Sequence, residues 1–212
     1  MQWTLVIPLK PLSRAKSRLS DAAADALRPG LALAFAQDTV AAALASPAVK
    51  DVAVVTNDAL AGRELGALGA HIVPDEPDDG LNAALAHGAA IVRSCRPESA
   101  VAALNADLPA LRPLELARVL DSAAEFPRAF LPDAAAIGTT LLAAAPGQEL
   151  LPAFGTDSRA RHRESGAMEL DLDEVDSVRQ DVDTGADLRA ALTLGVGPRT
   201  ATAAARLLIK EQ

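Results

Sequence analysis

Four basic residues gather just after the first apolar run of the chain. Lys10, Arg14, Lys16 and Arg18 occur in "LKPLSRAKSR" (9–18), which follows "WTLVIP". Lysine and arginine side chains in such a loop could neutralise the phosphates of an anionic ligand. The loop contains neither the GxxxxGK[ST] nor the GxGxxG phosphate-binding pattern. A solvated basic loop that leads into a helix therefore explains the composition equally well.

An acidic residue stands at the end of another apolar run. Asp107 occurs in "LNADLPAL", at the end of the run 99–107. A Mg²⁺ ion bound to phosphates takes one or two carboxylates from the protein, and Asp107 could supply one of them. The alternative is that Asp107 caps a helix expected after Pro109.

Two further acids lie one residue apart in "DVDTGADL" (181–188). If the backbone is extended there, the side chains of Asp181 and Asp183 point to the same face and could share a ligand. Asp183 and Thr184 could equally cap the following helix, with Asp187 at the third helical position of a capping box. For Asp183 the two roles compete.

The segment "AFGTDSRARHR" (153–163) combines a glycine, a serine and several cations. Gly155 would permit close backbone approach, Ser158 could donate its hydroxyl, and the start of a helix favours an anion. The alternative is an ordinary glycine turn followed by an exposed basic helix, on which His162 is a surface histidine. Asn82, expected in the first turn of a helix after "DEPDDG" (75–80), is a weaker candidate for reading the edge of a nucleotide base.

The candidate site residues can act together only if the secondary structure brings them close in space. Apolar runs predict strands at 3–9, 51–57, 71–74, 99–107, 128–133 and 139–145. Ala-rich segments predict helices at 25–46 with a break near Pro29-Gly30, at 60–69, 81–94 and 113–126. Segment 180–195 is predicted to be a strand end that continues into a helix. We expect one α/β domain over residues 1–212, in which 155–179 makes an excursion over the active face.

Continuous apolar strands that alternate with helices are typical of a mostly parallel sheet flanked by helices on both faces. In such open sheets ligands bind at the carboxyl ends of the strands. This edge would carry the polar residues that follow the predicted strands, namely Lys10, Thr56, Asn57, Asp58 and Asp107.

The composition excludes several classes of protein. The chain has 212 residues, a formal net charge of -8 and a pI of about 4.9, which argue against broad binding of nucleic acid or membrane surfaces. A single cysteine, Cys95, excludes an intramolecular disulfide framework and suits a reducing compartment. Neither a signal peptide nor a membrane-spanning apolar run is visible. We therefore expect a cytoplasmic protein that holds any anionic ligand with a local cluster of cations.

Taken in order along the chain, seven segments resemble the guanylyltransferases of deazaflavin coenzyme F-420 biosynthesis. They are "VIPLKPLSRAKSRLS", "DVAVVTND", "DEPDDGLNAALAHG", "ALNADLPAL", "IGTTLLAA", "FGTDSRARHRESGA" and "DVDTGADLRAALTLGVGPRT". The resemblance covers about residues 3 to 200. It implies the Rossmann-like nucleotidyltransferase fold that is shared with molybdenum-cofactor guanylyltransferase and sugar-nucleotide enzymes.

The resemblance also implies roles for individual residues. Asp107 and Asp183 would hold Mg²⁺, and Thr140, Gly155 and Ser158 would hold the phosphate and carboxylate of a small acid. The triphosphate of GTP would lie against the opening loop, with Lys10, Lys16 and Arg18, and Lys16 would assist catalysis with the two acids. The wider group has a glycine-rich loop here, whereas this loop has no glycine and must grip phosphate through side chains.

The reaction implied is transfer of GMP from GTP to the phosphate of a small acid, with release of pyrophosphate. We expect phosphoenolpyruvate as the acceptor, because the resemblance is to actinobacterial members; 2-phospho-L-lactate and 3-phosphoglycerate are alternatives. The product, enolpyruvyl-diphospho-guanosine, is labile, which leaves room for a transient contact with the next transferase. A related transferase with another acceptor, and a non-catalytic GTP-binding regulatory protein, are the rival hypotheses.

Overall fold

The computed structural model describes residues 1–14 and 27–210. Within them the chain forms one seven-stranded sheet of order β3-β2-β1-β4-β6-β5-β7. The strands are β1 (Trp3–Pro8), β2 (Val49–Val55), β3 (His71–Val73), β4 (Ala100–Leu104), β5 (Arg128–Pro132), β6 (Thr139–Ala144) and β7 (Met168–Glu169). The helices are the short 3₁₀ turn η1 (Leu12–Arg14), α1 (Arg28–Leu44), α2 (Ala59–Gly66), α3 (Leu81–Cys95), α4 (Pro113–Ala123), α5 (Ser158–Glu164), α6 (Asp176–Arg179), α7 (Gly185–Leu194) and α8 (Pro198–Lys210).

The sheet is mostly parallel, as the alternation of strands and helices predicts. Strand β6 is the exception, because it pairs antiparallel with both β4 and β5. It therefore starts at the edge where its neighbours end, and this places Thr139 at the edge of the sheet where β1 and β4 end. The segment 155–179 contributes α5, β7 and α6, and β7 pairs parallel with β5 at the end of the sheet.

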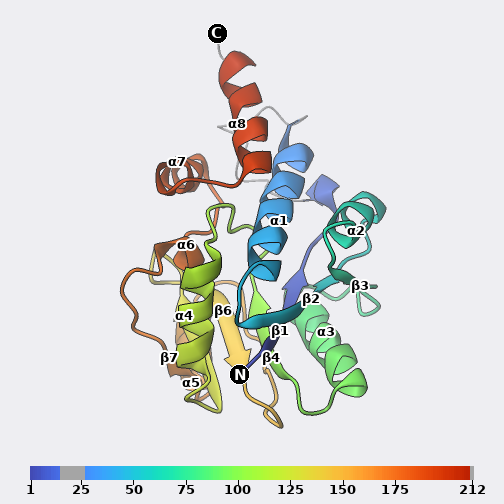
Figure 1. The fold of residues 1–212 in the computed structure, drawn as a ribbon, viewed down its shortest axis with the longest axis vertical. Coiled ribbons are helices and arrows are strands. Elements are labelled where there is room, and N and C mark those ends of the chain that lie inside the picture. The colour runs from blue at the N-terminus through green and yellow to red at the C-terminus, as the bar shows by residue number, and fades with distance from the viewer. Residues whose placement is uncertain (15–26, 211–212) are drawn as a thin grey trace.

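Two apolar layers cover the faces of the sheet. Figure 1 shows α1 and α4 in front of the strands. Their buried residues pack with Trp3, Leu5 and Ile7 of β1 in the larger cluster. Val6, on the opposite face of the same strand, packs with α3 in the smaller cluster. This alternation along β1 is what a strand buried on both faces requires.

Helix α8 projects beyond the rest of the molecule at the top of Figure 1. Its first turn is anchored to α1, where the buried side chain of Asp38 accepts hydrogen bonds from the backbone N–H groups of Thr200 (2.7 Å) and Arg199 (3.3 Å). A carboxylate at a helix N-terminus satisfies unpaired N–H groups and the helix dipole. Among the described residues, every helix is too short or too polar to cross a lipid bilayer.

The local boundaries correct three of the sequence-based predictions. Helix α1 runs unbroken from Arg28, because Pro29 lies in its first turn, where a missing N–H costs nothing. Strand β4 ends at Leu104 instead of at Asp107. Residues 180–183 form a loop and no strand, because Val182 pairs with Asp107 beyond the carboxyl end of β4 instead of joining the ladder of the sheet.

Candidate functional site

A cleft of about 760 Å³ opens at the edge where β1 and β4 end and β6 begins. Lys10 and Asp107 line it, as the strand-end rule predicts. Segment 155–158, between β6 and β7, and the acids Asp181 and Asp183, in the loop before α7, also line it. The cleft therefore gathers a cation, several carboxylates and a glycine-serine segment into one space.

The carboxylates are brought together by a backbone hydrogen bond. The N–H of Val182 donates to the carbonyl of Asp107 at 3.1 Å, which fixes the two acidic segments against each other. The side chain of Val182 is fully buried, while both of its neighbours, Asp181 and Asp183, line the cleft. Asn105 donates to Asp181 Oδ2 at 3.4 Å and to the carbonyl of Thr139 at 3.4 Å. The alternation predicted from the sequence thus holds in a loop.

The helix that follows the acids is capped by Thr184. Its hydroxyl accepts from the N–H of Asp187, and the Asp187 carboxylate accepts in return from the N–H of Thr184, so the capping box is complete. The cap of α7 therefore falls on Thr184. Asp183 lines the cleft and is not the capping residue, so its two predicted roles do not compete.

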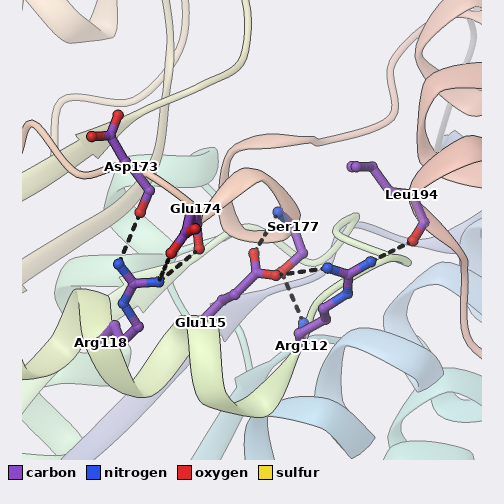
Figure 2. A network of polar contacts seen from close by, with 7 residues as sticks. All are labelled: Arg112, Glu115, Arg118, Asp173, Glu174, Ser177 and Leu194. Atoms are coloured by element: carbon purple, nitrogen blue, oxygen red, sulfur yellow. Dashed lines mark hydrogen bonds and ion pairs between the residues drawn. The ribbon is translucent and has the colours of Figure 1, made fainter.

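A polar network holds both ends of this acidic segment. Figure 2 shows it: Arg112, Glu115, Arg118, Asp173, Glu174, Ser177 and Leu194. The carboxylate of Glu115 accepts from the N–H of Ser177 in α6 (2.9 Å), and the Ser177 hydroxyl accepts from the N–H of Arg112 (3.0 Å). The Arg112 guanidinium donates to Glu115 (3.0 Å) and to the carbonyl of Leu194 at the end of α7 (2.7 Å). Helix α4 thereby fixes the elements on either side of residues 180–184.

The donor set suits a hard divalent cation. Asp107 and Asp183 line one cleft and offer carboxylate oxygens, the ligands that Mg²⁺ and Mn²⁺ accept. Among the described residues no group of three or more His, Cys, Asp or Glu side chains could hold a metal by itself. Two carboxylates fit an ion whose remaining positions are filled by phosphate oxygens and water.

The opening loop is anchored at its start. The N–H of Leu12 donates to Asp58 Oδ2 at 2.9 Å, while Asp58 Oδ1 caps α2 through Leu60 and Ala61 (both 3.0 Å). Thr56 supports this turn by accepting from the N–H of Asp58. These two residues of the predicted edge therefore shape the loop, and Lys10 faces the cleft. Lys16 and Arg18 lie outside the described residues.

Asn82 has a structural task in this arrangement. Its amide nitrogen donates to the carbonyl of Phe154 (3.1 Å) and its amide oxygen accepts from the N–H of the same residue (2.8 Å). It is not one of the residues that line the cleft, whereas its neighbour Leu81 is. Asn57 makes the same two-point contact with the backbone of Asp75. Each asparagine amide thus donates to the carbonyl and accepts from the N–H of one distant residue, as the backbone of a neighbouring strand does.

The glycine-serine segment is held in a tight turn. Gly155 has φ of +109°, a left-handed conformation that favours glycine, and the N–H of Ser158 donates to its carbonyl (3.1 Å). Arg161 donates to the carbonyls of Phe154 and Thr156 and so braces the same turn. Ser158 opens α5 and is 2% exposed, and both Gly155 and Ser158 line the cleft.

Of the two threonines at the start of β6, one lines the cleft and the other lies in the core. Thr140 is fully buried and is not among the residues that line the cleft. Its neighbour Thr139 does line it, next to Gly138. The loop before them is closed by Asp133, whose carboxylate accepts from the N–H groups of Ile137 (3.0 Å) and Gly138 (2.9 Å).

The alternative in which His162 is a surface histidine is wrong. The side chain is fully buried, and its ring lies 5.0 Å from the ring of Phe154 and 5.7 Å from that of Phe130. Burial away from water, together with the positive charges of Arg128 and Arg161, lowers the pKa of His162 to about 4. His162 is therefore a neutral imidazole at physiological pH.

The burial of His162 could have been predicted from the spacing of the residues along α5. Ser158 and His162 are four residues apart and share the inner face of α5, whereas Arg159 and Arg163 share the outer one. Both arginines pair with Glu169, and the hydrogen bond from Arg159 is the largest cause of the lowered pKa of that carboxyl. The same strand-end rule that found Asp107 could have found Asn105.

The chain matches a family model described as "Guanylyl transferase CofC like" over residues 3–207. It belongs to the CofC-like guanylyltransferase family. A relative from Streptomyces avermitilis, named phosphoenolpyruvate guanylyltransferase, is 83% identical over 99% of this chain and 97% of its own. A relative of the same name from Streptomyces coelicolor is 80% identical over the whole of both chains, and one from Thermomonospora curvata is 60% identical over 98% of this chain and 90% of its own.

Solved structures place the CofC-like chain in the nucleotidyltransferase fold. A nucleotidyl transferase from Methanothermobacter has a TM-score of 0.62 at 18% identity, covering 91% of this chain and 97% of its own. The CTP complex of CMP:2-keto-3-deoxy-manno-octonic acid synthetase has a TM-score of 0.58 at 17% identity, covering 92% and 98%. A Mycobacterium tuberculosis protein solved as a complex with manganese has a TM-score of 0.54 at 22% identity, covering 91% and 99%. The fold expected from the alternating elements is confirmed.

Proposed function

We propose that the protein transfers GMP from GTP to the phosphate of phosphoenolpyruvate, as a step in coenzyme F-420 biosynthesis. A phosphate oxygen of the acceptor attacks the α-phosphorus of GTP and forms a new P–O–P linkage. The bond between the α- and β-phosphates breaks, and pyrophosphate leaves with the electron pair. The product is enolpyruvyl-diphospho-5'-guanosine. The close relatives that bear this activity in their names support the acceptor.

The observation that carries the proposal is the meeting of two unlike groups of residues in one cleft. Lys10, Asp107 and Asp183 come from the strand ends and the acidic loop, and suit a metal-bound triphosphate. Gly155 and Ser158 come from the turn that leads into α5 and suit a small anion. Two anionic substrates must be brought together against their repulsion, and such a cleft positions both.

The residues of the cleft account for most of what the reaction requires. A divalent ion held by Asp107 and Asp183, which we expect to be Mg²⁺, would supply positive charge to the phosphates of GTP when bound. Lys10 adds a cation to the same cleft, and the loop that contains Lys16 and Arg18 follows it in the sequence. The acceptor phosphate is already ionised near neutral pH, so the chemistry needs no general base.

The test is pyrophosphate release from GTP and Mg²⁺ with phosphoenolpyruvate, 2-phospho-L-lactate or 3-phosphoglycerate, and with ATP as the nucleotide control. A coupled transferase that consumes the labile product keeps the reaction moving. We expect release with phosphoenolpyruvate and GTP. GTP binding without release for all three acceptors would instead favour a regulatory GTP-binding protein.

The same assay tests the two carboxylates. Asp107→Asn and Asp183→Asn should each lower turnover at least about 100-fold, because each loses one of the charges that hold the ion. Thermal denaturation should be nearly unchanged, since both side chains line the cleft rather than the core. Asp121→Asn, at an exposed position on α4, is the matched control and should keep full activity. Full activity of Asp107→Asn with an unaltered Mg²⁺ requirement would overturn the metal assignment.

A further inference from the structure

His162 links three segments that each contain a residue lining the cleft: α5, the loop at Ala153 and the start of β6. It belongs to α5, its Nε2 lies 2.9 Å from the backbone nitrogen of Ala153, and its Nδ1 lies 2.9 Å from Oγ1 of Thr139 at the start of β6. A backbone N–H can only donate. Nε2 must therefore be the unprotonated nitrogen of the ring, and the single proton of the neutral imidazole lies on Nδ1.

This tautomer decides the direction of the contact with Thr139. The Nδ1–H group donates, and the threonine oxygen accepts through one of its lone pairs. The hydroxyl keeps its own proton for another partner. In the described part of the chain its oxygen has no second hydrogen-bond partner, and Thr139 lines the cleft.

We infer that Thr139 binds the phosphorylated acid by donating its hydroxyl proton to one of the acid's anionic oxygens, and that His162 is the positioning residue that keeps this proton available. The inference rests on the proposed function, because it names the residue that meets the acceptor. Thr139 thus joins Ser158, which lines the same cleft and lies one helical turn from His162 on α5.

The surroundings of His162 exclude the other states of the ring. A proton on Nε2 would face the N–H of Ala153, and Nδ1 would then take the hydroxyl proton of Thr139 away from the cleft. A doubly protonated ring would lose the Ala153 contact as well, and the nearby guanidinium groups of Arg128 and Arg161 oppose its charge. The rings of Phe130 and Phe154 both contact the imidazole and restrict its position.

Matched substitutions separate the parts of this argument. Thr139→Val removes the hydroxyl with little change of shape, and Thr139→Ser keeps it. At position 162, the amide of asparagine reaches the place of Nδ1, so His162→Asn can still donate to Thr139. The amide of glutamine reaches the place of Nε2, so His162→Gln can still accept from Ala153 but no longer donates to Thr139.

The measurements are KM for phosphoenolpyruvate and for GTP in the pyrophosphate assay, and equilibrium binding of phosphoenolpyruvate by calorimetry. Thr139→Val and His162→Gln should raise the acceptor KM and Kd about tenfold or more, with the KM for GTP unchanged, since a hydrogen bond to a charged group is lost. Thr139→Ser and His162→Asn should restore most of the affinity. The double variant Thr139→Val with His162→Gln should bind about as weakly as Thr139→Val alone.

Each other result speaks against the inference. An active Thr139→Val enzyme with an unchanged acceptor KM would overturn it and leave the proposed function standing. Equal losses for His162→Asn and His162→Gln, in step with their melting temperatures, would reduce His162 to a structural residue. Failure of the unsubstituted protein both to bind phosphoenolpyruvate and to release pyrophosphate would overturn the proposed function and the inference with it.

Discussion

At the scale of single residues, the buried imidazole of His162 makes stability depend on pH. The folded protein holds the ring neutral down to a pKa of about 4, whereas an unfolded histidine takes up a proton near 6.5. Between these values the unfolded state binds more protons, so the free energy of unfolding falls as the pH is lowered. The fall should amount to about 3 kcal/mol by pH 4. Chemical denaturation at several pH values between 4 and 7 measures it.

The control for this pH dependence is His162→Gln, which has no group to titrate at that position. It should be less stable than the native sequence at pH 7 but should lose less stability on acidification from 6.5 to 4. The carboxyl of Glu169 titrates below its ordinary value of 4.5, and its contribution is lost only at lower pH. Parallel curves for the two proteins would show that His162 is not the group responsible.

At the scale of elements, two asparagines with the same geometry hold different loops: one ties a loop to a helix, the other ties a loop to the end of a strand. Asn82 joins the N-terminus of α3 to Phe154, the residue before the Gly155 turn, while Asn57 joins the end of β2 to Asp75. Asn82→Ala should therefore raise the acceptor KM about tenfold, because the turn that bears Ser158 loses two hydrogen bonds. Asn57→Ala should leave that KM unchanged.

Kinetics with both substrates varied will check this expectation. A rise in the KM for GTP with Asn82→Ala, and none for the acceptor, would instead support the role in nucleotide binding that the sequence predicts for Asn82. Equal effects of the two substitutions would mean that neither loop acts on one substrate alone. Melting temperatures of the two variants should be lowered to a similar extent, since each loses the same pair of contacts.

At the scale of the whole molecule, α8 is held to the body by a close approach that only glycine permits. A Cβ on Gly197 would lie 2.3 Å from the carboxyl carbon of Asp38, which caps α8. Gly197→Ala should therefore lower the free energy of unfolding by about 1–3 kcal/mol. Gly30→Ala is the contrasting control, because no atom of the described residues lies within 4 Å of its Cβ position in α1. It should stabilise by roughly 0.5 kcal/mol, and urea denaturation of both variants distinguishes the two signs.

Much of this architecture could be predicted because it follows from local patterns. Apolar runs marked the strands, and the strand-end rule brought Lys10 and Asp107 to one edge. The direction of β6 could not be predicted, because "TTLLAA" is buried in either orientation and its partners are set by a hairpin and a crossover. The two-residue strand β7 has no detectable pattern. The burial of His162 was not predicted because arginines surround it in the sequence, although two of them, Arg159 and Arg163, lie on the other face of the helix and pair with Glu169.

Strand β6 lies between β4 and β5 although it follows both in the sequence, and this affects the order in which the protein folds during synthesis. Strand β4 emerges from the ribosome before its neighbour β6, and β5 has no place beside β4 until residues 139–144 separate them. Asp181 and Asp183 are synthesised later still, and so are the residues that contact Asp38. The contact between Asp38 and Thr200 spans 162 positions of the sequence. Such long-range contacts form slowly. A nascent chain therefore exposes the edge of β4 for a time and gains its substrate-binding cleft only when synthesis is nearly complete.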